Sequence, residues 1–261
     1  MRALPSVIVA LCFVAAFADA EAPLYSAASI ANSADNQSGP LAPNTLATIY
    51  GQNLAYGTKA LSSDDIKGGI LPTVFPGTGV HVLIGNIVAN LIYVSPTQIN
   101  FLVPANLIPA TVNAQVVVDG WAGPAIPIQL AAASPGLFQL DAQNAIATRA
   151  DGSLITPDAP AKPGDVVVLY ATGLGQTLPP AVYSLIPKQA ASIIALADFT
   201  VSFDGVVADP GLVFYAGVAP GFGGLYQINL KLPGWVGPNP RIVIGLAGAL
   251  SAPGVTLPVQ P

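Results

Sequence analysis

The sequence predicts an all-β protein that consists of two tandem immunoglobulin-like β-sandwiches produced by an internal duplication. First, Pro and Gly each occur 26 times in 261 residues, which favours short strands and turns over long helices. Second, a hydrophobic content of 52% argues against disorder. Third, the stretch QINFLVP at Gln98 returns as QINLKLP at Gln227, so this part of the sequence is repeated.

Residues 1–20 have the features of a secretory signal peptide. Arg2 precedes an apolar run at residues 7–17, and Ala18 and Ala20 form the small-residue pattern that predicts cleavage after Ala20. The apolar run is shorter than the roughly 20 residues of a membrane-spanning helix. We therefore expect an exported protein, secreted or at the cell surface, that does not insert into a membrane once the signal is removed.

The composition limits the partners of the mature chain. The single cysteine of the sequence, Cys12, lies in the predicted signal, so the mature chain contains none. No disulfide is therefore expected, and stability must come from the burial of apolar residues. Charged residues make up only 8% of the chain, and the formal net charge is −5. Such a surface offers no electrostatic reason to bind nucleic acid or anionic lipid.

Three pairs of similar segments define the two copies. Their shifts of 120, 119 and 129 residues keep the same order along the chain. In the second pair, the dipeptides Gly85-Asn86 and Asp204-Gly205 predict hairpin turns. The segments start at Pro43 and Pro163, at Val80 and Phe199, and at Gln98 and Gln227.

The repeated QIN stretch alternates apolar and polar residues with the period of a half-buried strand. In the second copy, Ile228 and Leu230 would point inward while Gln227 and Asn229 point outward, and Pro233 would end the strand. We favour this structural role for Gln and Asn over a sugar-binding role.

The predicted domains are a first sandwich at residues 21–130, a connecting segment at 131–162 that contributes strands, and a second sandwich at 163–261. Each sandwich is expected to end in an apolar strand, AIPIQL in the first copy and VTLPV, from Val255, in the second. A short helix is expected at 188–198. The Gly-rich stretch AGVAPGFGG is interpreted as a hairpin loop.

Several ordered blocks resemble an uncharacterised C-terminal domain family of large exported acidobacterial proteins. The blocks are LAPNTLATIYGQNLA, YVSPTQINFLVP, SPGLF, RADGSL, KPGDVVVLYATGLG, YAGVAPGFGGLYQINLKLP and VTLPV. The opening of each copy is also similar to the immunoglobulin-like IPT/TIG modules of surface receptors. The resemblance to the acidobacterial family covers nearly all of the mature chain, whereas the IPT/TIG similarity is short, and it implies an exported β-sandwich module with no assigned reaction.

The sequence offers little for catalysis or metal binding. His81 is the only histidine, so a zinc site built on histidines lacks ligands, and a Ser-His-Asp site would have to use His81. We expect His81 to be an outward-facing strand residue. No calcium-loop pattern is present, and we predict no metal and no cofactor. A hydrolase that uses paired carboxylates is the least favoured hypothesis; its candidate residues are Asp64, Asp65, Asp141 and Asp158.

Two tryptophans occur in similar pentads, Gly120–Pro124 and Gly234–Pro238. Trp121 and Trp235 can stack against a sugar ring or a partner's side chain, or fold back as plugs over the ends of the sandwiches. We favour the plugs. The candidate binding residues are Trp121, Trp235, Phe222 and Tyr226.

We therefore predict a non-catalytic module for interaction or adhesion at the cell surface or outside the cell. The alternative is a carbohydrate-binding module that uses the loop tryptophans. The expected partner is an unidentified surface protein or a polysaccharide, and exposed edge strands would also permit self-association.

Overall fold

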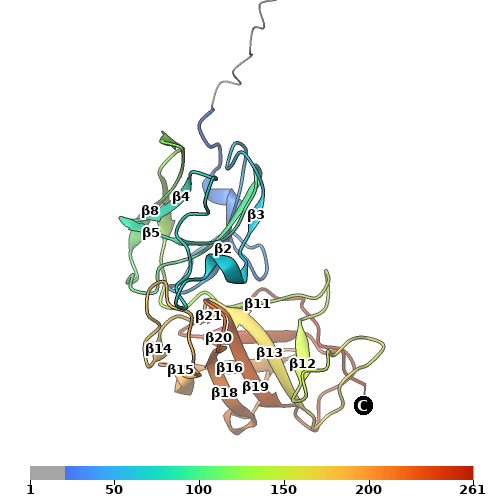
Figure 1. Cartoon of the computed structure of the whole chain (residues 1–261). Helices are drawn as coiled ribbons and strands as arrows, with labels where there is room; N and C mark the ends of the chain where they lie inside the picture. Colours follow the sequence, from blue (N-terminus) through green and yellow to red (C-terminus); the bar gives the residue numbers. More distant parts are fainter. Residues whose placement is uncertain (1–20, 261) are drawn as a thin grey trace, which may run out of the picture.

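The computed structural model describes residues 21–260, so the predicted signal peptide lies outside the described residues. Within this range the chain has no α-helix, and its strands, drawn as arrows in Figure 1, form four antiparallel sheets. The helical segments are single 3₁₀ turns. They are η1 (Ala27–Ser29), η2 (Ser63–Asp65), η3 (Leu196–Asp198) and η4 (Pro210–Leu212). The all-β prediction is confirmed.

The first sandwich pairs a sheet of order β1-β2-β7-β6-β3 with a sheet of order β10-β8-β4-β5, in which β9 joins β8. Inward residues of both sheets, among them Ile49, Val82 and Phe101, form one core. The strands are β1 (Ile30–Asn32), β2 (Leu46–Tyr50), β3 (Lys59–Ala60), β4 (Val80–Ile84), β5 (Ile87–Val88), β6 (Asn90–Val94), β7 (Gln98–Leu102), β8 (Thr111–Val118), β9 (Trp121–Ala122) and β10 (Ile126–Gln129).

The second sandwich pairs a sheet of order β11-β13-β19-β18-β15-β14 with one of order β17-β16-β20-β21, and it has a separate core. Both β11 and β12, which lie in the connecting segment, pair with β13. The strands are β11 (Gly136–Leu137), β12 (Ala147–Arg149), β13 (Val166–Thr172), β14 (Thr177–Leu178), β15 (Ala191–Ile193), β16 (Thr200–Phe203), β17 (Val206–Val207), β18 (Val213–Val218), β19 (Tyr226–Lys231), β20 (Ile242–Leu246) and β21 (Ala249–Leu250).

The QIN repeats lie on β7 and β19, the strands that pair with β2 and β13. Gln98 Nε2 donates a hydrogen bond to Asn100 Oδ1 at 2.8 Å, and Gln227 Nε2 donates to Asn229 Oδ1 at 2.8 Å. The isoleucine between each pair is fully buried. Since Gln and Asn bond each other on the outward face, the repeat has a structural explanation that requires no ligand.

The two predicted hairpins are present. Gly85-Asn86 joins β4 to β5, and Asp204-Gly205 joins β16 to β17. Asp204 and Gly205 have φ values of 48° and 82°, the positive values that a type I′ turn requires.

The helix expected at residues 188–198 is wrong. Residues 191–193 form β15, which pairs with β14 and β18, and only η3 is helical. The burial of Ala191 and Ile193 around a half-buried Ser192 has the period of a strand, and the neighbouring strands supply the backbone partners.

The final strand expected from Val255 is also wrong. Thr256 and Val259 make isolated bridges to Asn144, Arg241 and Ala161 instead. Pro258 lies within this stretch and lacks the N–H donor that a continuous ladder needs.

Two segments of the second sandwich contact the first. In Figure 1 the orange chain next to β14 reaches toward the blue-to-green first sandwich. There, Leu71 N donates to Ser184 O at 2.8 Å, and Ile186 N donates to Gly69 O at 2.9 Å. Asn90 Nδ2 also donates to Ser184 Oγ at 2.9 Å.

The second contact is the Gly-rich loop at 219–225, which connects β18 to β19 as predicted and also lies against the first sandwich. Thr172 Oγ1 accepts from Leu46 N at 2.9 Å and donates to Gly224 O at 2.7 Å. A Cβ at Gly224 would collide with the Leu102 side chain, and the φ of Gly224 is +74°. Glycine is therefore needed here for close approach and for its backbone conformation.

Candidate binding surfaces

Both tryptophans are about half exposed. Trp121 lies on β9, where it pairs with Val118, and its side chain is 52% exposed. Trp235 is 53% exposed and packs edge-on against the buried Phe203, with ring centroids 6.3 Å apart. Trp235 thus covers the core in part, as a plug would, while half of its surface stays free.

The other two candidate residues differ from each other. Phe222 lies in the 219–225 loop and is 61% exposed. Tyr226 is fully buried, which corrects its assignment as a surface binding residue. Its hydroxyl donates to Gly175 O and accepts from Asn44 Nδ2 at 3.1 Å, and burial raises its pKa. The alternation along β19 explains this placement, because Tyr226 shares the inward face with Ile228 and Leu230.

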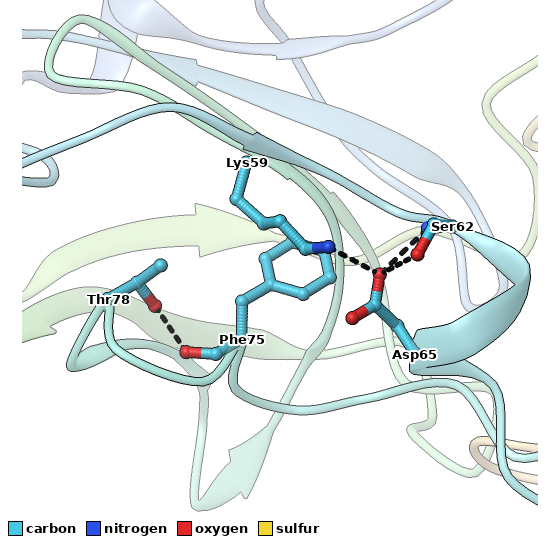
Figure 2. Close-up of polar contacts among 5 residues, drawn as sticks. All are labelled: Lys59, Ser62, Asp65, Phe75 and Thr78. Carbon is cyan, nitrogen blue, oxygen red and sulfur yellow. Dashed lines mark hydrogen bonds and ion pairs between the residues drawn. The ribbon is translucent and has the colours of Figure 1, made fainter.

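The Asp65 carboxylate has a structural role that Figure 2 shows. Its Oδ2 accepts from Ser62 Oγ at 2.6 Å, from Ser62 N at 2.8 Å and from Lys59 Nζ at 3.0 Å. The Ser62 hydroxyl and the Lys59 ammonium together lower the pKa of Asp65 to about 2. Lys59 Nζ also lies 5.8 Å from the centre of the Phe75 ring, a cation–π contact.

Asp141 also accepts local hydrogen bonds. Both of its oxygens receive the Asn144 side-chain amide, and Oδ1 further accepts the N–H groups of Gln143 and Asn144. These bonds, that of the Asn144 side chain first, lower the pKa of Asp141. His81 is half-buried on β4 between the buried Val80 and Val82, the alternation that was predicted. Within residues 21–260 no three His, Cys, Asp or Glu side chains gather as metal ligands.

The structure adds a hollow of mixed polar and apolar lining that the sequence did not indicate. We call it the junction hollow, and its volume is about 490 Å³. The turn that contains Asp35, the connecting segment at Ser134 and the second sandwich at Leu250 and Ser251 all line it. Burial raises the pKa of Asp35. The polar run SADNQS signals an exposed turn, but only the tertiary fold brings Ser134 and Ser251 beside it.

Membrane crossing by a helix has no support in the described residues, where no helix is long and apolar enough to span a bilayer.

Comparison with solved structures finds several distant matches. A surface glycan-binding protein of Prevotella bryantii has 12% identity and a TM-score of 0.27 over 90% of this chain and 41% of its own. The SGBP-B protein of the Bacteroides ovatus mixed-linkage glucan utilization locus, solved with a heptasaccharide, has 10% identity and a TM-score of 0.32 over 85% and 43%. Domains 5–6 of the S-layer protein SbsC have 10% identity and a TM-score of 0.27 over 91% and 98%.

This chain spans less than half the length of those two glycan-binding proteins. No curated protein matches it. Residues 31–139, which hold most of the first sandwich and continue through β11, match the IPT/TIG domain family. That segment therefore contains an immunoglobulin-like IPT/TIG domain within an all-β chain.

Proposed function

We propose that this protein is an exported, non-catalytic β-sandwich module that binds a surface protein or a polysaccharide at the cell surface or outside the cell. The observation that carries the proposal is the exposure of two aromatic rings, Trp121 on the paired strand β9 and Trp235 packed against Phe203. An aromatic ring that is already fixed loses little conformational freedom when a partner covers it. The signal-like residues 1–20 support export.

The low charge of the chain supports a contact that is mainly apolar. Charged residues make up 8% of the sequence, and the described residues contain one ion pair, Lys59–Asp65. Salt screens charge pairs far more than apolar contacts. Binding should therefore persist at high ionic strength.

The test measures retention of the purified protein on intact cells and on their extracellular matrix at low and high salt. Trp121→Ala and Trp235→Ala should each weaken retention at least about tenfold, the loss typical of a central aromatic contact. Ile108→Ala is the matched control, because Ile108 is a large exposed apolar residue in the loop between β7 and β8. Absence of any retention, or its complete loss in salt, would contradict the proposal.

A second candidate is carbohydrate binding through the same indole rings, which the half exposure of both tryptophans favours. Sugar rings stack on such faces through their C–H groups, and stacking changes indole fluorescence. Titration of the tryptophan emission with a panel of polysaccharides tests this candidate. A constant emission with every polysaccharide would remove it.

A further inference from the structure

The junction hollow is built from three parts of the chain that are distant in sequence. The turn at residues 32–40 belongs to the first sandwich, Ser134 and Pro135 belong to the connecting segment, and residues 250–253 follow β20 in the second sandwich. Its volume of about 490 Å³ falls within the range of small-molecule sites, which is roughly 300–1,000 Å³. The hollow exists only while both sandwiches are held together.

Hydrogen bonds join the turn to the connecting segment and hold Ser251 within the second sandwich. Asn32 Nδ2 donates to Ser134 O at 3.0 Å, and Ser134 Oγ donates to Pro40 O at 2.6 Å. Ser251 Oγ accepts from Ile244 N at 3.1 Å. The walls are therefore preorganised, which lowers the entropy cost of binding a ligand.

The lining combines hydrogen-bonding groups with apolar surface. Asp35, Gln37, Ser38 and Ser251 supply oxygen and amide groups, and Leu250, whose side chain is 69% exposed, supplies an apolar face. A sugar unit has the same two characters, hydroxyl groups at its rim and C–H groups on its ring face.

Asp35 is the one charged residue in this lining. Its Oδ1 accepts from Gln37 N at 3.0 Å, and burial raises the pKa of the carboxyl group. The donor that the structure places on this carboxylate is the backbone N–H of Gln37, two residues along the same turn. A carboxylate has about four lone-pair sites, so it can accept further O–H donors.

We propose that the junction hollow binds a neutral, hydroxyl-rich ligand, a sugar unit of a polysaccharide, with Asp35 accepting hydrogen bonds from its hydroxyl groups. This inference rests on the proposed binding function and gives it a ligand class and a site separate from the tryptophans.

Affinity electrophoresis of the purified protein in gels that contain dextran, a soluble β-glucan or a galactan tests this inference. We expect at least one polysaccharide to retard the wild type and Asp35→Asn to bind it at least about tenfold more weakly, as for loss of a charged hydrogen-bond acceptor. Leu250→Gln, a change of similar size at an exposed position, should also weaken binding. Asp198→Asn, an exposed carboxylate outside the hollow, should bind as the wild type does.

The other outcomes separate this inference from the proposed function. If Trp121→Ala and Trp235→Ala abolish polysaccharide binding while Asp35→Asn and Leu250→Gln bind normally, the junction site is overturned and the proposed function stands. The inference is also overturned if no polysaccharide retards the wild type, or if only a cationic polymer such as poly-lysine does. Retention on cells without polysaccharide binding would leave the proposed function intact with a protein partner.

Discussion

Tyr226 shows how a single buried hydroxyl group can join the two sandwiches. The residue lies on β19 of the second sandwich, and its hydroxyl accepts from Asn44 Nδ2 of the first at 3.1 Å while it donates to Gly175 O. Within residues 21–260 no buried side-chain nitrogen or oxygen lacks a hydrogen-bond partner. The polar groups at this contact are therefore compensated for their loss of water.

Tyr226→Phe should destabilise the protein, because it leaves Asn44 Nδ2 and Gly175 O without this partner in a buried site. A buried group left unsatisfied costs about 1–3 kcal/mol of folding free energy. Chemical denaturation measures the change, with Tyr56→Phe as the control at an exposed tyrosine. A loss no larger than that of the control would contradict this role.

Asp65 should make stability depend on pH in the acid range. Its folded-state pKa is lowered to about 2 from an ordinary value of 3.8, so its contribution is present above pH 4 and is lost as pH falls through 2. Thermal midpoints of the wild type and Asp65→Asn should therefore converge between pH 4 and pH 2. A constant gap between the wild type and Asp65→Asn over this range would refute the assignment.

At the scale of strands, the two sandwiches share details of pairing that support the proposed duplication. Tyr50 pairs with Gln98, and Tyr170 pairs with Gln227 in the same register. Each copy also has an irregularity on the opposite side of the QIN strand, next to Tyr93 and Tyr215. We propose that both sandwiches descend from one repeated unit.

The two QIN asparagines should nevertheless differ in energetic weight. Asn100 Oδ1 accepts from Gln98 Nε2 and from Thr48 Oγ1 at 3.1 Å, whereas Asn229 Oδ1 accepts only from Gln227 Nε2. At about 1 kcal/mol for each hydrogen bond, Asn100→Ala should cost more stability than Asn229→Ala. Urea denaturation compares the two variants, and an equal or reversed order would show that these bonds do not set the cost.

Local signals in the sequence were sufficient for some elements. Period-two alternation indicates β7 and β19, and Asp204-Gly205 indicates the hairpin between β16 and β17. At these places the backbone conformation is set by residues that are adjacent in sequence. Residues 188–198 were mistaken for a helix because Ala, Ile and Leu suit either structure, and the choice depends on pairing with β18. Tyr226 could have been assigned to the core from the alternation of its own strand.

Of the candidate binding surfaces, the sequence indicates the tryptophans but not the junction hollow. The tryptophans were identified from their pentads, but their half exposure depends on β8 and on Phe203, which the pentads do not reveal. The junction hollow requires residues more than 200 positions apart to meet. No local pattern encodes such a contact.

On the scale of the whole molecule, the contacts through residues 178–190 and 219–225 should make the sandwiches unfold together. Gly224→Ala would place a side chain against Leu102 at a φ of +74°, and should uncouple them into two transitions. Gly221→Ala is a matched control, because Gly221 has a φ of +88° but open space around its Cβ position. Differential scanning calorimetry should show one transition for the wild type and for Gly221→Ala.

Two transitions in the wild type would show that the sandwiches are independent. A single transition in Gly224→Ala at an unchanged midpoint would show that this loop does not couple them.

The central claim, that the exposed indole rings contact the binding partner, is tested most directly by acrylamide quenching of tryptophan fluorescence. Trp121 and Trp235 are the two tryptophans of the chain, so with a partner that contains no tryptophan the signal reports only on them. The protein is measured free and saturated with a polysaccharide that retains it. We expect acrylamide to quench the bound protein less than the free protein. Replacing a tryptophan that contacts the partner with Phe should remove its share of this difference. Equal quenching in the free and bound protein would contradict the claim.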